Sequence, residues 1–148
     1  MDLGACGIQD AGIRQLQSIL YKCKILRLNK NNLQDSGVKF LSTVLKENGC
    51  KVETLELKSN ALTDDCVKSL VSAISQKGSL MELDMSNDNQ RSEQSNRLTD
   101  KSVPTFLQLI QTRTNLKEIR LQNNQFSAKG CLSLKSVRAS DQLTIITE

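Results

Sequence analysis

Residues 52–74 read VETLELKSNALTDDCVKSLVSAI, and the spacing of apolar side chains changes within this stretch. Leu55 and Leu57 alternate with polar residues, as in a half-buried strand. After a tight bend, apolar residues recur at helical spacing from Val67 to Ile74. The stretch therefore predicts a strand, a turn and a helix, and neither element can bury its apolar side without neighbouring copies.

Copies of this unit recur along the chain. Their leading strand residues are Leu26, Leu55, Leu83 and Ile119, which lie 29, 28 and 36 residues apart. The last step equals 28 residues plus an insertion of eight, and we place the polar insertion at 89–97. A shortened copy opens the chain and a half-copy closes it. The predicted repeats lie near 1–22, 23–49, 50–77, 78–113 and 114–140, with a closing strand at 141–148.

The consensus of these copies, LxxLxLxxNxLxDxGVxxLxxxL, resembles the leucine-rich repeat of the ribonuclease-inhibitor subtype. The resemblance extends over essentially the whole chain. It implies an α/β solenoid, or horseshoe, of about five repeats, with a parallel β-sheet on the concave face and helices on the convex face. We expect one repeat domain spanning 1–148, and a fragment of a longer chain because the first repeat is incomplete.

Asparagine recurs at the bend that follows each strand, at Asn31, Asn60 and Asn124. A buried Asn amide offers two donors and an acceptor, enough to bridge its own bend and the next one. We therefore expect a structural Asn ladder, broken where Cys6 and Asp88 stand in the Asn position.

Polar residues also mark the expected helix starts. Near each start lies an aspartate, where a carboxylate meets the positive end of the helix dipole, and several starts have a candidate N-cap. The aspartates are Asp10, Asp35, Asp64 and Asp100, and the candidate N-caps are Thr63, Thr99 and Ser127. Pro104 is predicted in the first turn of a helix that begins near residue 101 or 102.

The composition excludes several classes of protein. The net charge of +4 is well mixed, which argues against nucleic-acid or anionic-membrane binding. No apolar run is long enough to span a membrane. The five cysteines include no CxxC pair, so we expect buried, reduced thiols that act as small apolar side chains. Reduced thiols favour a cytoplasmic location.

Catalytic chemistry has no support in the sequence. The chain contains no His, so there is no imidazole base for a Ser or Cys nucleophile. Neither a GxxxxGK[ST] loop nor a GxGxxG turn is present, so no nucleotide site is indicated. We expect no enzyme activity, cofactor or metal.

The candidate binding surface is the concave face together with the insertion. Side chains between the core leucines face outward there, and one row runs through Asp2, Arg27, Glu56, Asp84 and Arg120, where opposite charges can pair across strands. The candidate partner-binding residues are Arg27, Asn29, Lys30, Glu56, Lys58, Asp84, Asn87, Arg91, Glu93, Arg97, Arg120 and Gln122. The rows lack the aromatic anchors common at interfaces, so a plain solvated polar face is the alternative interpretation.

The resemblance includes ribonuclease inhibitor, Ran GTPase-activating protein and the C-terminal repeats of NOD-like receptors. Residues 50–57, CKVETLEL, resemble the opening common in the NOD-like receptor repeats. This implies a protein-interaction or ligand-sensing domain of an innate immune sensor. Its expected partner is another protein or other domains of the same parent chain. The alternative is a free-standing cytosolic scaffold or a GTPase regulator resembling Ran GTPase-activating protein.

The same residues bear on two further functions, ribonuclease binding and self-association. Binding a basic ribonuclease calls for an acidic face, and the positive net charge of the chain argues against it. Self-association is a weaker hypothesis, based on an open strand edge at the N-terminal repeat.

Overall fold

The computed structural model describes residues 1–20, 22–76, 79–88, 92–112, 115–137 and 143–148. Short strands alternate with helices through these residues. Their order is α1 (Asp10–Gln15), α2 (Gln17–Leu20), β1 (Ile25–Arg27), α3 (Gln34–Leu45), β2 (Thr54–Glu56), α4 (Asp64–Gln76), β3 (Glu82–Asp84), η1 (Asp100–Ser102), α5 (Val103–Thr112), β4 (Glu118–Arg120), α6 (Ala128–Ser136) and β5 (Thr144–Ile146).

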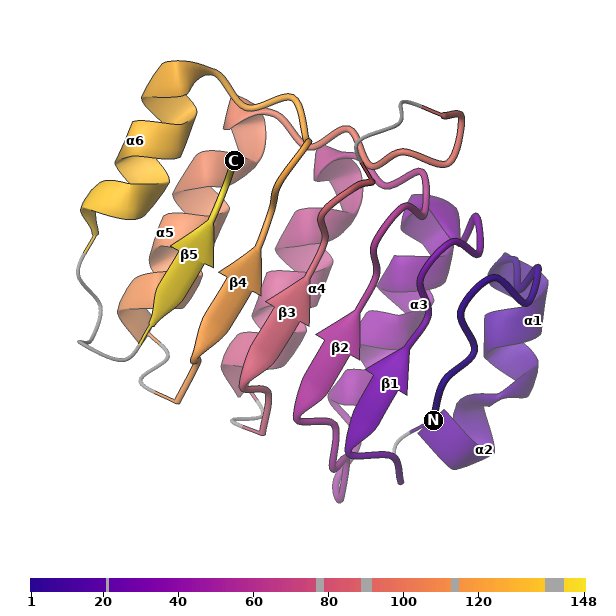
Figure 1. Ribbon diagram of the computed structural model, residues 1–148. Helices are drawn as coiled ribbons and strands as arrows, with labels where there is room; N and C mark the ends of the chain where they lie inside the picture. Colours follow the sequence, from indigo (N-terminus) through magenta and orange to yellow (C-terminus); the bar gives the residue numbers. More distant parts are fainter. Residues whose placement is uncertain (21, 77–78, 89–91, 113–114, 138–142) are drawn as a thin grey trace.

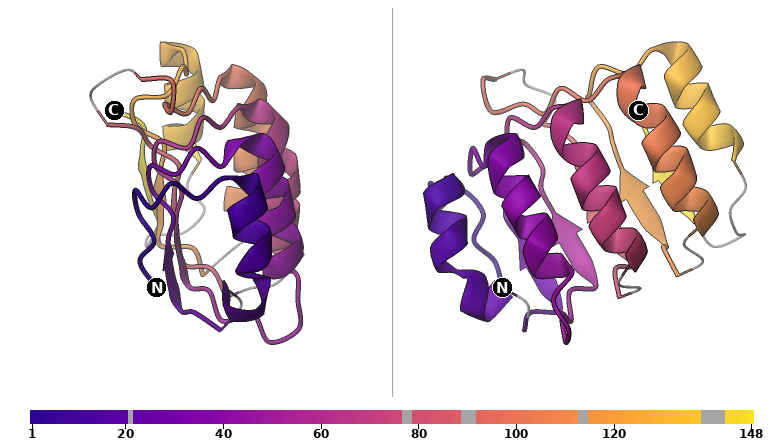
Figure 2. Two further views of the ribbon diagram at one scale, coloured as in Figure 1. Left: turned by 90° about the vertical axis from the view of Figure 1, so that its right-hand side faces the viewer. Right: turned by 180° about the vertical axis from the view of Figure 1, so that it is seen from behind.

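The five strands form one parallel sheet in the order β1-β2-β3-β4-β5, and the helices cover one side of it (Figures 1 and 2). The register pairs Leu26 with Leu55, Leu55 with Leu83, and Leu83 with Ile119. These are the leading strand residues of the sequence repeats. The predicted fold, an α/β leucine-rich-repeat solenoid with a parallel sheet, is confirmed.

The core lies between the sheet and the helices. Leu55 and Leu57 from the second strand are buried against Val67 and Leu70 of α4, and the same positions are buried in the neighbouring repeats. Burying one such side chain contributes roughly 1.5–3 kcal/mol relative to leaving it exposed. Because each repeat covers the apolar face of the next, the core is continuous along the array.

The first helix differs from the prediction. The sequence favours one helix over 10–21, but the structure has α1 and α2 with a break at Leu16, whose N–H donates to Ile13 O in a tighter turn. The break rotates the following residues, so Ile19 is 39% exposed where burial was expected. Ile13 and Leu20 are buried as predicted.

The later helix starts agree with the sequence. Pro104 is the second residue of α5, directly after the η1 turn. Thr99 accepts a hydrogen bond from Lys101 N, and Ser127 accepts one from Gly130 N. At the end of the chain, β5 pairs with β4 as the expected closing strand, although residues 141–142 of that prediction lie outside the described residues.

The N-terminal residues run beside β1. Leu3 N donates to Arg27 O at 2.9 Å and Ala5 N donates to Asn29 O at 2.8 Å. These bonds continue the ladder of the sheet by one partial strand.

The cysteines only partly follow the prediction. All five are free thiols, and Cys66 is buried, but Cys6 is exposed and the other three are half-buried. Burial raises the pKa of the Cys66 thiol. The expectation of buried thiols is wrong for Cys6 because its repeat has no neighbour to cover the bend.

Candidate protein-interaction surface

The Asn ladder joins each repeat to the one before it. Asn60 is 0% exposed, and its Oδ1 accepts from Asn31 N at 3.1 Å and from Leu33 N at 3.2 Å. Its Nδ2 donates to Leu28 O at 2.8 Å. Asn31 does the same for the first repeat, where its Oδ1 accepts from Cys6 N and Ile8 N at 3.0 Å each. The structural role predicted for these asparagines is confirmed.

The ladder is not broken at the insertion. Asn96 is 1% exposed, and its Oδ1 accepts from Asn60 N at 2.9 Å and from Leu62 N at 3.0 Å. The prediction that Asp88 occupies the ladder position is therefore wrong. The extra eight residues lie at 88–95, before Asn96, rather than at 89–97.

A second ladder joins the helix starts, and the sequence interpretation missed it. Asp35 accepts from Thr63 N at 2.8 Å and from Thr63 Oγ1 at 2.5 Å. Asp64 accepts from Thr99 in the same way, at 2.9 and 2.6 Å. Each aspartate thus binds the N-cap residue of the following repeat, in addition to any interaction with its own helix dipole.

A glycine slot serves this second ladder. A Cβ at Gly37 would lie 2.6 Å from Asp10 Oδ1, and one at Gly130 would lie 2.2 Å from Asp100 Oδ1. Neither glycine has a positive φ. Small size at this position keeps room for the aspartate of the preceding repeat.

The insertion is attached to the neighbouring repeats rather than standing free. Gln94 O accepts from Ala61 N at 2.7 Å. The carboxylate of Asp88 contacts Lys30 Nζ at 2.7 Å and Lys58 Nζ at 2.6 Å. Hydrogen bonds from these two lysines lower the pKa of Asp88. Lys30 and Lys58, both candidate partner-binding residues, pair with this carboxylate at the base of the insertion.

Two other candidate residues have packing roles. Asn87 is 4% exposed, donates to Asn96 O and Asn123 O, and accepts from Asn96 N. Asp84 is 9% exposed and accepts from Ser86 N and Ser86 Oγ. Asn87 is thus a packing residue rather than an exposed binding residue, while Asp84 still lines the concave pocket, 3.9 Å from Arg120 Nη1. Arg91 lies outside the described residues.

The concave row of charges forms as predicted at two of its steps. Arg27 Nε lies 2.9 Å from Glu56 Oε1, and Arg120 Nη1 lies 3.9 Å from Asp84 Oδ2. At the third step, Asp2 Oδ1 accepts from Gly4 N. Strand register therefore places the row correctly, while side-chain partners close to the chain end differ.

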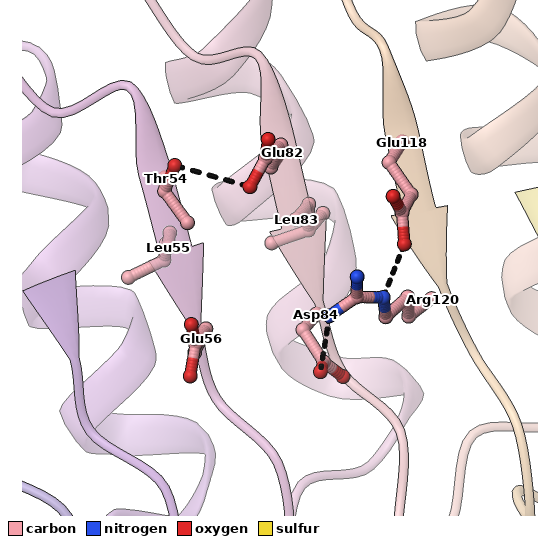
Figure 3. A pocket seen from close by; sticks show the side chains of 8 residues that line it. All are labelled: Thr54, Leu55, Glu56, Glu82, Leu83, Asp84, Glu118 and Arg120. Carbon is pink, nitrogen blue, oxygen red and sulfur yellow. Dashed lines mark hydrogen bonds and ion pairs between the residues drawn. The ribbon is translucent and has the colours of Figure 1, made fainter. Parts of the chain in front are cut away.

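A shallow pocket lies at the centre of the concave face, between β2, β3 and β4 (Figure 3). Glu82 accepts from Thr54 Oγ1 at 3.2 Å, and Glu118 contacts Arg120 Nε. The Glu118 hydrogen bond raises the pKa of Arg120. Glu56 and Asp84 complete the carboxylates that line the pocket.

Charge is distributed unevenly between the two faces. In strands β1 to β4 the outward positions carry more carboxylates than cations: Glu56, Glu82, Asp84 and Glu118 against Arg27 and Arg120. The net charge of the chain thus does not describe the concave face. The net-charge argument against a basic partner does not hold for this surface.

The remaining candidates divide between the strands and the rim. Asn29 bridges two strands, since its Nδ2 donates to Glu56 Oε2 at 2.7 Å and its Oδ1 accepts from Lys58 N at 2.9 Å. Gln122 is half-buried. Glu93 and Arg97 are exposed on the rim and line a groove between the insertion and the start of α3.

A membrane-spanning helix and a metal-binding cluster are both absent from the described residues. None of their helices is long and apolar enough to cross a membrane. They contain no cluster of three or more His, Cys, Asp or Glu side chains arranged to hold a metal ion.

Comparison with known proteins identifies similar sequences. Residues 24–42 and 113–135 match the family model described as Leucine Rich repeat. The chain is 36% identical over 89 residues to NACHT, LRR and PYD domains-containing protein 14 of Mus musculus, covering 58% of this chain and 9% of that protein. It is 33% identical over 91 residues to ribonuclease inhibitor of Mus musculus, covering 60% of this chain and 20% of that protein.

Among solved structures, Leiomodin-1 Actin-Binding Site 2 has the same fold. It superposes with a TM-score of 0.67 at 18% identity, covering 91% of this chain and 75% of that chain. The match at this identity shows the fold alone. The repeat register and the family-model match agree on a leucine-rich-repeat chain, and its sequence is similar to short parts of ribonuclease inhibitor and of NACHT, LRR and PYD domains-containing proteins.

Proposed function

We propose that this chain is the non-enzymatic, ligand-sensing repeat domain of a cytoplasmic receptor of the NOD-like type, and that it binds protein through its concave face and insertion. The observation that carries the proposal is a division of labour among polar side chains. The buried Asn and Asp ladders hold repeats together. The exposed charges of the sheet remain for a partner.

The concave surface fits a partner with both basic and acidic groups. Glu56, Glu82 and Glu118 lie around the central pocket, where lysines or arginines of a partner would face carboxylates. Arg27 and Arg120 lie at either side of these carboxylates and suit acidic groups. Complementary charge of this kind mainly raises association rate and specificity.

The insertion lies beside this surface, and residues 88–95 can be deleted without disturbing the repeat spacing. Deleting residues 88–95 restores the 28-residue spacing from Leu83 to Ile119. Asn87 would then precede Asn96 directly, as Asn123 precedes Asn124 in the next repeat. The deletion therefore keeps the Asn ladder while removing the insertion.

The proposal is tested by capture of a cytosolic partner with four proteins. These are the wild type, the 88–95 deletion, a concave variant with Glu82→Lys and Glu118→Lys, and a convex control with Glu47→Lys and Asp65→Lys. We expect the concave variant to lose the partner and the control, which has the same charge change, to retain it. Capture by the concave variant equal to that by the wild type would contradict the proposal.

A second candidate function is binding of a basic ribonuclease. The concave carboxylates and the similarity to ribonuclease inhibitor favour it. Titrating a basic pancreatic-type ribonuclease with the protein and measuring RNA cleavage provides the test. Inhibition that disappears in the concave variant would support this function, and unchanged cleavage would remove it.

The flanking coding sequence of the parent gene separates the receptor from its alternative. A NACHT-encoding segment upstream is expected for the receptor. If none is present, a free-standing scaffold or Ran-type GTPase regulator takes its place. Measuring GTP hydrolysis by a Ran-type GTPase with and without the protein then distinguishes these two.

A further inference from the structure

The helices carry a row of cations on the face opposite to the sheet. Arg14, Lys39 and Lys68 occupy the same place in α1, α3 and α4, four residues after Asp10, Asp35 and Asp64. Carboxylates and cations four residues apart ordinarily pair along a helix. Here Asp35 and Asp64 bind Thr63 and Thr99 of the following repeats instead. The inter-repeat ladder therefore leaves the lysines of these helices without their local partners.

A groove between α3 and α4 brings Lys39 and Lys68 together with a third lysine, Lys46. The two helices lie side by side on the convex face (Figure 2). The groove has a volume of about 320 Å³ and is lined by Lys39, Lys46 and Lys68 together with Ser42, Thr43, Ser69 and Ser72. All three lysines are exposed. The salt bridges among the described residues involve other side chains.

Arg14 is not available to the groove in the same way. Its guanidinium lies over the Phe40 ring, 4.7 Å from the centroid, on the side of α3 that faces α1. The cations that line the groove are therefore the three lysines.

The hydroxyls of the groove are arranged to accept hydrogen bonds. Ser42 Oγ donates to Val38 O at 2.8 Å, and Thr43 Oγ1 donates to Phe40 O at 2.7 Å. Since their protons are used within α3, the oxygens offer lone pairs. Lone pairs suit the N–H groups of a peptide and not the oxygens of a phosphate.

We propose that the α3–α4 groove binds an acidic peptide segment in a polyproline II conformation, with carboxylates three residues apart. Lys39 and Lys46 are separated by seven residues of helix, about 10 Å at 1.5 Å per residue. Three residues of a polyproline II helix rise about 9 Å and complete one turn, so carboxylates at this spacing lie on one face. Neighbouring helices lie roughly 8–10 Å apart, which places Lys68 at a similar distance across the groove.

Other anionic partners fit this surface less well. A membrane-bound helix face needs apolar side chains beside its cations. The exposed large apolar residues of the described chain, Met1, Ile19, Ile25 and Leu132, lie outside the groove. Single-stranded nucleic acid is bound with aromatic stacking platforms, and no aromatic side chain lines the groove.

The test measures binding of a fluorescent peptide, acetyl-Glu-Gly-Ser-Glu-Gly-Ser-Glu-amide, by anisotropy at low ionic strength. The groove variant carries Lys39→Gln, Lys46→Gln and Lys68→Gln. The matched control carries Lys51→Gln, Lys101→Gln and Lys129→Gln, which removes the same charge from exposed positions outside the groove. We expect affinity to fall on the order of tenfold in the groove variant and less than twofold in the control.

Several results would overturn the proposal. The first is that the wild type does not bind the peptide. The second is that both triple variants lose peptide affinity to the same extent. The third is that the wild type binds a peptide of the same composition, with its glutamates adjacent, equally tightly. Tighter binding of phosphatidylserine vesicles or single-stranded RNA, lost in the groove variant, would assign the groove to those ligands instead. The concave variant Glu82→Lys and Glu118→Lys should bind the peptide as the wild type does, so failure of the proposed function and failure of this proposal are distinguishable.

Discussion

The bend of the third repeat and the bend of the first repeat have the same backbone role but different side chains. Asn60 accepts two N–H groups of the preceding repeat and donates to a carbonyl there. At the equivalent place in the first repeat, Cys6 offers a thiol that reaches only Gly4 O, at 3.4 Å. Each Asn side chain therefore stabilises the repeat before its own, and a repeat depends on the one that follows it.

The largest effect is expected at the bends themselves. Asn60→Ala leaves buried N–H groups of Asn31 and Leu33 without an acceptor, and each unsatisfied group costs about 1–3 kcal/mol. Cys6→Ala removes one weak contact on an exposed side chain. We expect Asn60→Ala to lower the free energy of unfolding by about 3 kcal/mol and Cys6→Ala by under about 0.5 kcal/mol. Urea denaturation of both variants measures the difference. Similar losses in free energy of unfolding would show that the Asn side chain contributes no more than Cys6 at this position.

The second ladder should give a smaller contrast between two adjacent aspartates. Asp64 accepts from Thr99 N, Thr99 Oγ1 and Ser102 Oγ in the next repeat. Asp65 is exposed at the following position. Asp64→Ala is expected to cost about 1–3 kcal/mol, and Asp65→Ala about 0.5 kcal/mol or less. If thermal or urea unfolding showed Asp65→Ala to be the more costly change, the ladder would have no energetic role.

A similar contrast is expected between glycines of the same repeat slot. A Cβ at Gly12 would meet no aspartate but only Ile8 Cγ2 at 3.2 Å, so a small shift of that side chain lets Gly12→Ala gain helix propensity of roughly 0.5–1 kcal/mol. Gly37→Ala would place its Cβ against Asp10 and disturb that contact. We expect the two variants to differ by about 1 kcal/mol in free energy of unfolding, with Gly12→Ala the more stable. Equal stability would show that the slot does not require a small residue.

The smallest effect concerns pH and the insertion. Lys30 and Lys58 lower the pKa of Asp88 below its ordinary value of 3.8. The carboxylate therefore stabilises the fold above that value, and this contribution is lost as pH falls through the lowered pKa. Asp88→Asn should reduce the free energy of unfolding at pH 7 by roughly 0.5 kcal/mol, because both lysines are partly exposed and screened.

Unfolding titrations at pH 7 and at about pH 2.5 test this assignment. The difference between wild type and Asp88→Asn should shrink at the lower pH, as the pH falls toward the lowered pKa and the carboxyl takes up a proton. A difference that grew on acidification would show that Asp88 does not pair with the lysines.

Much of the fold was predictable because the repeat pattern encodes it. Spacing of Leu26, Leu55 and Leu83 predicted the strand register, and buried amide chemistry predicted the role of Asn31 and Asn60. The break after α1 was not predictable, because it depends on a local backbone turn at Leu16 rather than on the apolar pattern.

The insertion was misplaced for an identifiable reason. Counting forward from Leu83 puts Asp88 in the Asn position, whereas counting back from the Leu98–Asp100 helix start gives Asn96. The second count matches the Asn60–Asp64 spacing and would have found the right bounds. The Asp–Thr ladder was missed because Asp35 and Thr63 were each interpreted within one repeat, although their contact is between repeats.

The binding surface was only partly predictable. Register placed Arg27, Glu56 and Arg120 on the concave face correctly. Burial of Asp84 and Asn87 depends on hydrogen bonds with Ser86 and with Asn96, which no periodicity encodes.

Hydrogen exchange at single amides gives the most direct test of the claim that polar side chains of one repeat hold the repeat before it. In Asn60→Ala, verified as folded by circular dichroism, the amides of Asn31 and Leu33 should exchange faster, while the amides of Asn60 and Leu62 stay protected by Asn96. Faster exchange confined to residues 60–62, with Asn31 and Leu33 unchanged, would contradict the account.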